Sequence, residues 1–320
     1  MGSPAQLYQN SNSDDYRVLS IQSHVVSGYV GNRSAVFPLQ VLGFDVDFIN
    51  TVQFSNHTGY PVVKGSVLDE LSLQELYDGL KENDLDRQYS HLLTGFVRSK
   101  GLLCKLGDIA RDLKRTNPSL VYVCDPVLGD HGKMYVNADV LEVYRDTILS
   151  LADIMTPNQF EAELLSDIRI TDAQSAVKAM DCLHDKGPRT IIISSSELGN
   201  EEVLVAFASS MTDGKTVRYR IDIPRFPASF NGTGDLFAAV FLAWHTKSDG
   251  NLQHSLEATV STLQAVIRRT LANLSKINHQ GILSPKDLEL RLVQSRSDIE
   301  HPVICVNAVE LLTPAASVKE

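Results

Sequence analysis

The 320-residue chain has no long apolar run and no excess of basic residues. No stretch approaches the roughly 20 apolar residues that span a bilayer, so we do not expect a membrane protein. Lys and Arg total 29 against 39 Asp and Glu, and the formal net charge of −10 argues against nucleic-acid and anionic-membrane partners. A negatively charged substrate would therefore need a local positive site, such as a helix N-terminus or a metal ion.

The chain has few cysteines, and they form no motif. Cys104, Cys124, Cys182 and Cys305 are widely spaced without a C-x-x-C pair, which indicates neither a zinc site nor a disulfide framework. Their neighbours in sequence are apolar, so we expect reduced cysteines in the core. The polar segment 1–16 lacks the basic-then-apolar order of a signal peptide. These features together predict a cytoplasmic protein.

Common catalytic and nucleotide-binding motifs are missing as well. The chain has no G-x-x-x-x-G-K-[ST] sequence, the signature of a Walker P-loop, and no H-E-x-x-H. A G-x-G occurs at 232–234, but Phe237 takes the place of a third glycine. This motif also lies late in the chain, whereas a dinucleotide-binding fingerprint normally follows an early strand. A dinucleotide-binding site is therefore a weak explanation of these glycines.

Strand and helix patterns alternate along the chain. Apolar runs typical of strands lie at 17–22, 45–53, 91–93, 120–124, 153–156 and 190–193. Helical spacing is found at 30–42, 71–80, 102–114, 158–165, 172–186, 236–244, 251–276 and 284–295. Residues 203–208 and 216–223 predict an antiparallel hairpin. The alternation predicts an α/β fold with a mostly parallel, doubly wound central sheet flanked by helices.

We expect a single domain, because no repeat, low-complexity tract or long linker divides the chain. Its boundaries are set at 17 and 312, with a disordered N-terminal tail at 1–16 and a C-terminal tail at 313–320. Ligands of an open α/β sheet bind at the carboxyl ends of its strands. The residues that follow the predicted strands are polar, small or acidic, and lie at 23–24, 54–58, 94–95, 125–130, 156–161 and 194–196.

The most informative segment is the loop before the helix at 236–244. Gly232 and Gly234 allow a phosphate to approach the backbone closely, and the unpaired N–H groups of a helix N-terminus bind anions. Asp235 is unexpected there, because a carboxylate repels phosphate. It is explained if it accepts the proton of a hydroxyl group that is being phosphorylated. The alternative is an ordinary helix start with an acidic first turn.

Three acidic residues are predicted at one rim of the sheet. Asp125, Asp130 and Glu161 suit a Mg²⁺–nucleotide complex, since Mg²⁺ takes one or two carboxylates plus water and phosphate oxygens. A structural explanation competes with this one. Asp125 caps the turn at Pro126 in that case, and Glu161 forms a capping arrangement with Asn158.

Two further polar segments have both a binding and a structural interpretation. Ser194 and Ser195 follow a strand and either contact phosphates or form a turn. Segment 53–60 combines an aromatic ring with several hydrogen-bonding groups, which suits a flat polar heterocycle. His57 within it is more often a structural hydrogen-bonding residue than a ligand-binding one.

Together these segments resemble the pyridoxal kinase family of the ribokinase-like superfamily. The resemblance runs from about 17 to about 310 and is carried by residues 17–24, 28–32, 52–60, 122–130, 156–163 and 232–237. It implies transfer of the ATP γ-phosphate to the 5′-hydroxymethyl group of pyridoxal, pyridoxine or pyridoxamine, which salvages vitamin B6 as pyridoxal 5′-phosphate. It also implies Mg²⁺ or another divalent cation with ATP, a monovalent cation (K⁺ or Na⁺) and a homodimer.

The resemblance assigns roles to particular residues, with Asp235 as the general base. The ring-binding residues it implies are Ser23, Val30, Val52, Phe54, Thr58, Tyr135 and Asp235. The ATP-side residues are Asp125, Asn158, Glu161, Ser194, Ser195, Phe230, Gly232, Thr233 and Gly234. Asp130 and Glu161 are assigned to Mg²⁺, and Asp125, Thr156 and Ser194 to the monovalent cation. Segment 130–135 corresponds to the lid loop over the substrate.

Two alternatives stay open at this point. The first is a non-catalytic module that holds nucleotide or vitamer for a partner, but such a binder gains nothing from a carboxylate in an anion site. Within the enzymes, a hydroxymethylpyrimidine kinase is the runner-up, because it shares the G-T-G-D motif.

Overall fold

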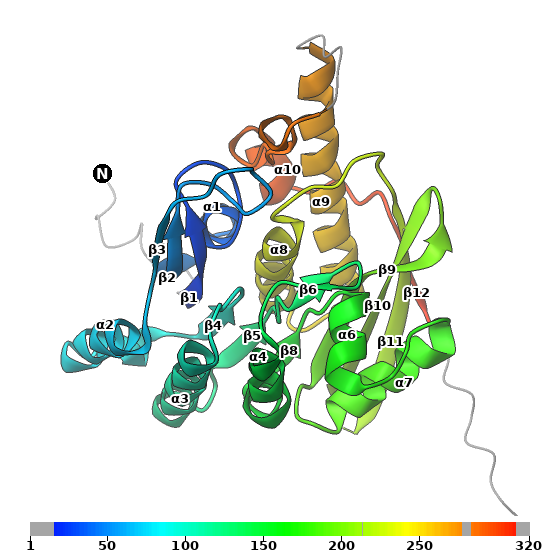
Figure 1. Ribbon diagram of the computed structural model, residues 1–320. Coiled ribbons are helices and arrows are strands. Elements are labelled where there is room, and N and C mark those ends of the chain that lie inside the picture. The colour runs from blue at the N-terminus through cyan, green and yellow to red at the C-terminus, as the bar shows by residue number, and fades with distance from the viewer. Residues whose placement is uncertain (1–15, 213, 277–282, 312–320) are drawn as a thin grey trace, which may run out of the picture.

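A ten-stranded sheet forms the middle layer of the molecule (Figure 1). The computed structural model describes residues 16–212, 214–276 and 283–311. In sheet order the strands are β12 (Ala308–Glu310), β11 (Lys215–Pro224), β10 (Val203–Thr212), β9 (Thr190–Asn200), β8 (Ile154–Met155), β5 (Val121–Cys124), β4 (His91–Thr94), β1 (Arg17–Val25), β2 (Asp45–Phe54) and β3 (Gly65–Val67). Neighbours from β9 to β2 run parallel, whereas β3, β10, β11 and β12 pair antiparallel. The predicted fold class is confirmed.

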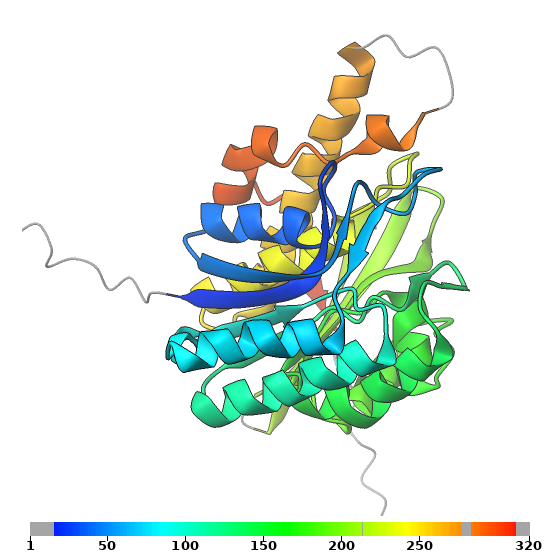
Figure 2. The same cartoon turned by 60° about the vertical axis from the view of Figure 1, so that its left-hand side comes forward.

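Helices cover both faces of the sheet and enclose a separate apolar cluster on each. One face carries α1 (Asn32–Val41), α8 (Thr233–Lys247), α9 (Leu252–Lys276) and α10 (Arg296–Glu300). The other carries α2 (Glu70–Glu82), α3 (Lys100–Thr116), α4 (Ala138–Val143), α5 (Leu149–Leu151), α6 (Gln159–Ser166) and α7 (Ala173–His184). Figure 2 shows α1 and α10 above the sheet and α2 and α3 below it.

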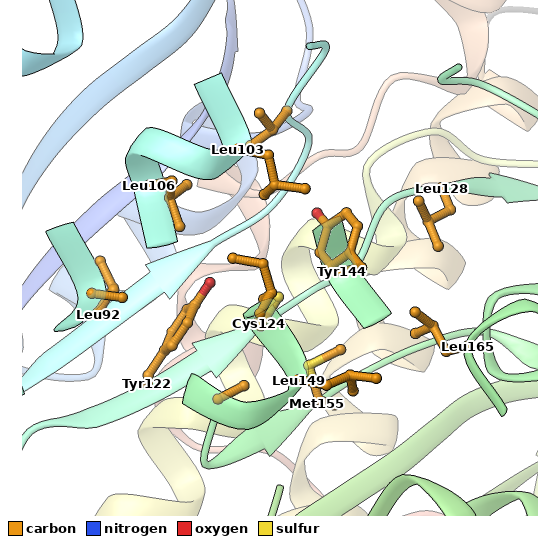
Figure 3. Close-up of a cluster of buried hydrophobic side chains, with 14 of the residues drawn as sticks. Leu92, Leu103, Leu106, Tyr122, Cys124, Leu128, Tyr144, Leu149, Met155 and Leu165 are labelled. Atoms are coloured by element: carbon orange, nitrogen blue, oxygen red, sulfur yellow. The ribbon is translucent and has the colours of Figure 1, made fainter. Parts of the chain in front are cut away.

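Strand β5 shows why an uninterrupted apolar run predicts a central strand. Tyr122 and Cys124 belong to the cluster on one face of the sheet, and Val123 belongs to the cluster on the other. All three side chains are fully buried. Figure 3 shows Tyr122 and Cys124 among Leu92, Leu106 and other apolar side chains of their cluster. Because successive strand residues point to opposite faces, only a strand covered on both sides buries such a run.

Helix α8 is buried as its composition predicts. Every residue from Leu236 to Ala243 is buried, and the helix packs against both α1 and α9. A helix enclosed in this way cannot shift without disturbing two neighbours. The loop before it is therefore held at a defined place.

The prediction of one helix over 284–295 is wrong. The chain instead forms two 3₁₀ turns, η4 (Pro285–Leu288) and η5 (Val293–Ser295), and α10 follows. Ser284 and Asp287 form a capping box at the start of η4. The helix ends early because Glu289 adopts an extended conformation, with φ −62° and ψ 130°, and its side chain bonds to distant residues.

The sequence patterns missed several short elements and one longer helical segment. The short elements include β3, β12, the 3₁₀ turn η2 (Leu85–Gln88) and the two-stranded hairpin of β6 (Gly129–Asp130) and β7 (Lys133–Met134). The longer segment runs through α4, the π-helical turn η3 (Tyr144–Ile148) and α5. The buried side chains of Val140, Val143, Tyr144 and Ile148 have helical spacing, which was the available signal.

Three of the four cysteines are not core residues. All four are unpaired, but only Cys124 is buried, whereas Cys182 is half-buried and Cys104 and Cys305 are exposed. Amphipathic helices and connectors place apolar neighbours beside exposed positions, which explains the error. Most of the two predicted tails lies outside the described residues. Tyr16, assigned to the N-terminal tail, stacks on Phe44 with ring centroids 5.2 Å apart. Among the described helices, none is long and apolar enough to cross a membrane.

Candidate active site

A cavity of about 1050 Å³ lies at the carboxyl ends of β5, β8 and β9. It contains all the predicted ATP-side and metal-site residues together with Tyr135 and Asp235. They are Asp125, Asp130, Tyr135, Thr156, Asn158, Glu161, Ser194, Ser195, Phe230, Gly232, Thr233, Gly234 and Asp235. Four segments of the chain, 125–135, 156–161, 194–195 and 230–235, thus meet in one place, as expected for the strand ends of a parallel sheet.

The loop before α8 begins the helix without a side-chain cap. Gly232 is the N-cap residue, with φ 81°, a backbone conformation that favours glycine. A Cβ on Gly232 would collide with the carbonyl oxygen of Tyr29, so this position also needs the small residue. The N–H groups of the first turn and the positive end of the helix dipole lie at the cavity wall. This arrangement suits an anionic group of a ligand.

Asp235 lies in that first turn, half-buried at the cavity wall. Burial raises the pKa of its carboxyl group above the usual value, although the backbone amides of Gly31 and Asp235 itself act in the opposite direction. A raised pKa brings a carboxylate closer to the range in which it exchanges protons at neutral pH. The position and environment of Asp235 therefore suit a general base.

Asp125 lies on the opposite side of the same loop. Its side chain is buried, and a Cβ on Gly234 would lie 3.5 Å from its Oδ2 atom. Burial raises the pKa of Asp125 well above its usual value, and the negative charges of Glu161 and Asp235 raise it further. Within the described residues none of these three carboxylates forms an ion pair with a basic side chain. The cavity is thus acidic, which favours bound cations.

Glu161 takes part in a capping box with Asn158, as the structural alternative expected. The backbone N–H of Asn158 donates to Oε2 of Glu161 over 2.9 Å, and the N–H of Leu128 donates to Oε1 over 2.9 Å. Burial nevertheless raises the pKa of Glu161 to about 8. The side chain of Asn158 also donates to the carbonyl of Gly129 over 2.8 Å. Both residues therefore hold the base of the β6–β7 hairpin.

The predicted lid at 130–135 is this tight β-hairpin. Asp130 pairs with Lys133, and both residues between them, His131 and Gly132, have positive φ angles of 47° and 75°. Two-residue hairpin loops commonly require positive φ at both positions. Tyr135 follows the hairpin at the cavity rim, and its side chain is 56% exposed.

Thr156, directly after β8, and Ser194, in β9, both line the cavity. The hydroxyl oxygen of Thr156 is buried and has no hydrogen-bond partner among the described residues. The hydroxyl of Ser194 donates to the carbonyl of Pro157 over 3.3 Å. An unpartnered buried oxygen is costly, so a ligand or ion that satisfies Thr156 fits this place.

The other ring-binding residues do not line the cavity. Ser23, Val30, Val52, Phe54 and Thr58 lie at the ends of β1 and β2 and in the loops that follow them. Ser23 and Val52 are buried, Val30 and Phe54 are half-buried, and Thr58 is exposed.

Two glycines, Gly31 and Gly232, connect the predicted ring-binding residues to the cavity. Gly31 lies directly against Ser23, and its amide is close to the Asp235 carboxylate. Gly232 lies against Tyr29 and Val30. Asp235 therefore stands at the boundary between the cavity and the predicted ring-binding residues.

Several residues near the site carried no signal in the sequence. Helix α9 contributes Val260, Leu263, Gln264 and Ile267 to the cavity wall. In the sequence, their spacing indicates only a helix and gives no sign of a binding site. Glu289 contacts the loops at 28–29 and 57–60 from a connector near the C-terminus. Local patterns cannot show such contacts, because they join segments far apart in sequence.

Comparisons with known proteins agree with this geometry. The model of the phosphomethylpyrimidine kinase family matches residues 85–282. Pyridoxal kinase of Bos taurus is 51% identical over 311 residues, covering 93% of this chain and 99% of the bovine protein. Pyridoxal kinase of Arabidopsis thaliana is 47% identical over 296 residues, covering 92% of this chain and 95% of the plant protein.

A solved structure extends the agreement to three dimensions. Pyridoxal kinase from Leishmania donovani, in complex with ADP and pyridoxamine, superposes with a TM-score of 0.86 at 35% identity. The match covers 93% of this chain and all of that one. Sequence, fold and the arrangement of the strand ends thus give one answer: the chain belongs to the pyridoxal kinase family.

Proposed function

We propose that this protein transfers the γ-phosphate of ATP to the 5′-hydroxymethyl group of pyridoxal, pyridoxine or pyridoxamine. The observation that carries the proposal is the place of Asp235, between an acidic cavity and a second set of predicted ring-binding residues. Its relatives support the substrates, since the Leishmania donovani protein is described in complexes with ADP and pyridoxamine and with ADP and pyridoxine.

The reaction at this site is an in-line displacement. The 5′-oxygen of the vitamer forms a bond to the γ-phosphorus while the bond from that phosphorus to the bridging oxygen breaks, and ADP leaves. Asp235 accepts the hydroxyl proton as the new bond forms. The N–H groups at the start of α8, beside Gly232, Thr233 and Gly234, would stabilise the charge on the phosphoryl oxygens.

The ATP side of the site would lie in the cavity. Ser194, Ser195 and Phe230 line it together with Asn158, and Asp125 and Glu161 contribute charge near the phosphates. Asp125 and Glu161 have no basic partner among the described residues, which favours a bound cation. A divalent cation would be held by Asp130 and Glu161. Mg²⁺ in such a place neutralises phosphate charge.

A monovalent cation would lie beside Thr156, Ser194 and Asp125. The unpartnered hydroxyl oxygen of Thr156 and the buried carboxylate of Asp125 supply oxygen ligands of the kind that K⁺ or Na⁺ takes. Such an ion would offset the charge that burial makes unfavourable at Asp125.

On the vitamer side, Ser23 and Thr58 would hydrogen-bond the pyridine ring. Val30, Val52 and Phe54 would flank it, which suits a flat ring with an apolar face. Tyr135 and the β6–β7 hairpin would cover the reacting groups and exclude water.

The site residues say nothing of assembly, but other features support two further proposals. The two strands at the β2–β3 edge of the sheet each expose an apolar side chain, Phe48 on β2 and Val67 on β3, which supports a homodimer. The unpaired cysteines support a cytoplasmic location. Light scattering measures the first, and fractionation of cells the second.

A coupled assay that follows ADP release from ATP with pyridoxal tests the proposed reaction. We expect turnover that depends on both substrates and yields pyridoxal 5′-phosphate. Binding of pyridoxal without turnover would indicate a non-catalytic module instead. Preferential phosphorylation of hydroxymethylpyrimidine in a competition assay would favour the runner-up activity.

A further inference from the structure

Glu289 is a half-buried acidic residue that the proposed mechanism does not use. It lies in the connector after η4, in neither the cavity nor the set of predicted ring-binding residues. Its side chain is 17% exposed, and its carboxylate receives hydrogen bonds from two distant loops. Burial by itself would raise the pKa of Glu289, but hydrogen bonds from His57, Tyr60 and Tyr29 lower it below the usual value.

Three donors converge on this carboxylate. The backbone N–H of Tyr29 donates to Oε2 over 3.0 Å. The hydroxyl of Tyr60 donates to Oε1 over 3.0 Å, and Nε2 of His57 lies 3.3 Å from the same oxygen. Only a group with two acceptor oxygens satisfies all three donors, because an amide would place its NH₂ opposite one of them.

The hydrogen bonds of His57 define its tautomer. The backbone N–H of Gly59 donates to Nδ1 over 3.1 Å, so Nδ1 is the acceptor nitrogen. The ring proton is then on Nε2, which faces Glu289. Both ring nitrogens are thus occupied by protein groups. His57 closes a turn around Thr58, the residue assigned to the pyridine ring.

The Glu289 carboxylate also contacts the turn that contains Val30. A Cβ on Gly28 would collide with the Glu289 carboxylate, so the turn and the connector are in direct contact. Tyr29 is bonded to Glu289, and its carbonyl oxygen lies against Gly232 in the loop before Asp235.

We infer that Glu289 is a positioning residue for the vitamer site. It fixes the positions of the turns at 28–31 and 57–60 relative to each other. Val30 and Thr58, which lie in these turns, are thereby placed to contact the pyridine ring. Glu289 touches none of the reacting groups in this arrangement and acts through His57, Tyr29 and Tyr60. This inference rests on the proposed function, because it concerns the binding of the same vitamer.

The test compares Glu289→Gln with the wild type and with Asp298→Asn. Asp298 pairs with Arg269 between α10 and α9, and its side-chain hydrogen bonds within the described chain reach neither turn, so it serves as a matched control. Loss of hydrogen bonds to a charged acceptor predicts a KM for pyridoxal that is about tenfold higher or more in Glu289→Gln. The KM for ATP should change less than about twofold, and Asp298→Asn should leave both constants unchanged.

A second variant separates an effect on vitamer binding from a folding defect. Tyr60→Phe removes one donor and leaves the other two, so we expect a smaller rise in the KM for pyridoxal. The double variant Tyr60→Phe/Glu289→Gln should show less than the product of the two single effects, since both act through one carboxylate. If Glu289→Gln lowers the melting temperature but leaves the ratio of the KM for pyridoxal to the KM for ATP unchanged, Glu289 only stabilises the fold.

Direct titration of pyridoxal by calorimetry separates this inference from the proposed function. A wild-type protein that does not bind pyridoxal would overturn the proposed function and this inference with it. A wild-type protein that binds pyridoxal while folded Glu289→Gln binds it equally well would overturn the inference alone.

Discussion

Asp235 lies near enough to Asp125 to raise the pKa of that buried carboxyl group, although the two residues come from the start of α8 and the end of β5. Gly234 separates them, and a side chain there would lie close to the Asp125 oxygen. Two carboxylates at so short a range are unfavourable unless one is protonated or a cation lies nearby. Under the proposed function, Asp235 would accept the proton and Asp125 would lie beside the cation.

Replacing the proposed base should abolish most of the turnover. Asp235→Asn keeps the shape of the side chain but cannot accept the hydroxyl proton, so we expect kcat to fall by about 10²–10⁴-fold. The KM for ATP should change little, because the backbone groups at the start of α8 remain. Steady-state kinetics with both substrates measures these constants. A variant that retains more than about a tenth of wild-type turnover would exclude Asp235 from this role.

The two acids assigned to Mg²⁺ should affect the metal requirement more than vitamer binding. Glu161→Gln and Asp130→Asn each remove a carboxyl group that would bind Mg²⁺ at the cavity, so half-maximal activity should need more Mg²⁺. Titration of Mg²⁺ at saturating pyridoxal measures this. Glu161 also takes part in the capping box of α6, so its replacement can affect folding as well as metal binding. Asp130→Asn is therefore the more direct test of the metal site. An unchanged Mg²⁺ dependence in both variants would leave capping as the explanation of Glu161.

The β6–β7 hairpin should protect the γ-phosphate from water. Removing residues 131–133 destroys the paired strands, so ATP hydrolysis without pyridoxal should rise relative to kinase activity with it. The control is His131→Asn, because asparagine tolerates the positive φ of this position. A ratio equal to that of the wild type in the shortened hairpin would show that another segment shields the site.

Stability should fall as the pH rises through the range in which Glu161 ionises. Burial raises the pKa of Glu161 from 4.5 to about 8, so between these values the folded chain retains a proton that the unfolded chain has lost. The free energy of unfolding then decreases with rising pH, by at most about 1.4 kcal/mol per pH unit for one group.

Denaturant unfolding of the wild type and Glu161→Gln at several pH values between 5 and 8 measures this effect. The wild type should lose stability relative to the variant as the pH rises, because glutamine does not ionise. Parallel curves for the two proteins would mean that Glu161 is already ionised in the folded state.

The order and type of the main elements could be read from the sequence because they depend on local periodicity. The apolar run at 120–124 is fully buried only in a strand covered on both faces of the sheet, and the apolar helix that begins beyond Asp235 is buried only where the sheet and neighbouring helices enclose it. The polar residues after the strands followed from the same pattern. Their collection in one cavity follows from the parallel sheet.

Tertiary structure decided what local periodicity does not encode. Helical spacing at 284–295 predicted one helix, yet three donors from distant loops hold Glu289 in an extended connector. The dual position of Glu161, as the cap of α6 and as an acid beside Asp125, likewise depends on segments that meet only in the fold. Periodicity reports which face of an element is buried, whereas hydrogen bonds and charges between distant segments depend on where the folded chain brings them together.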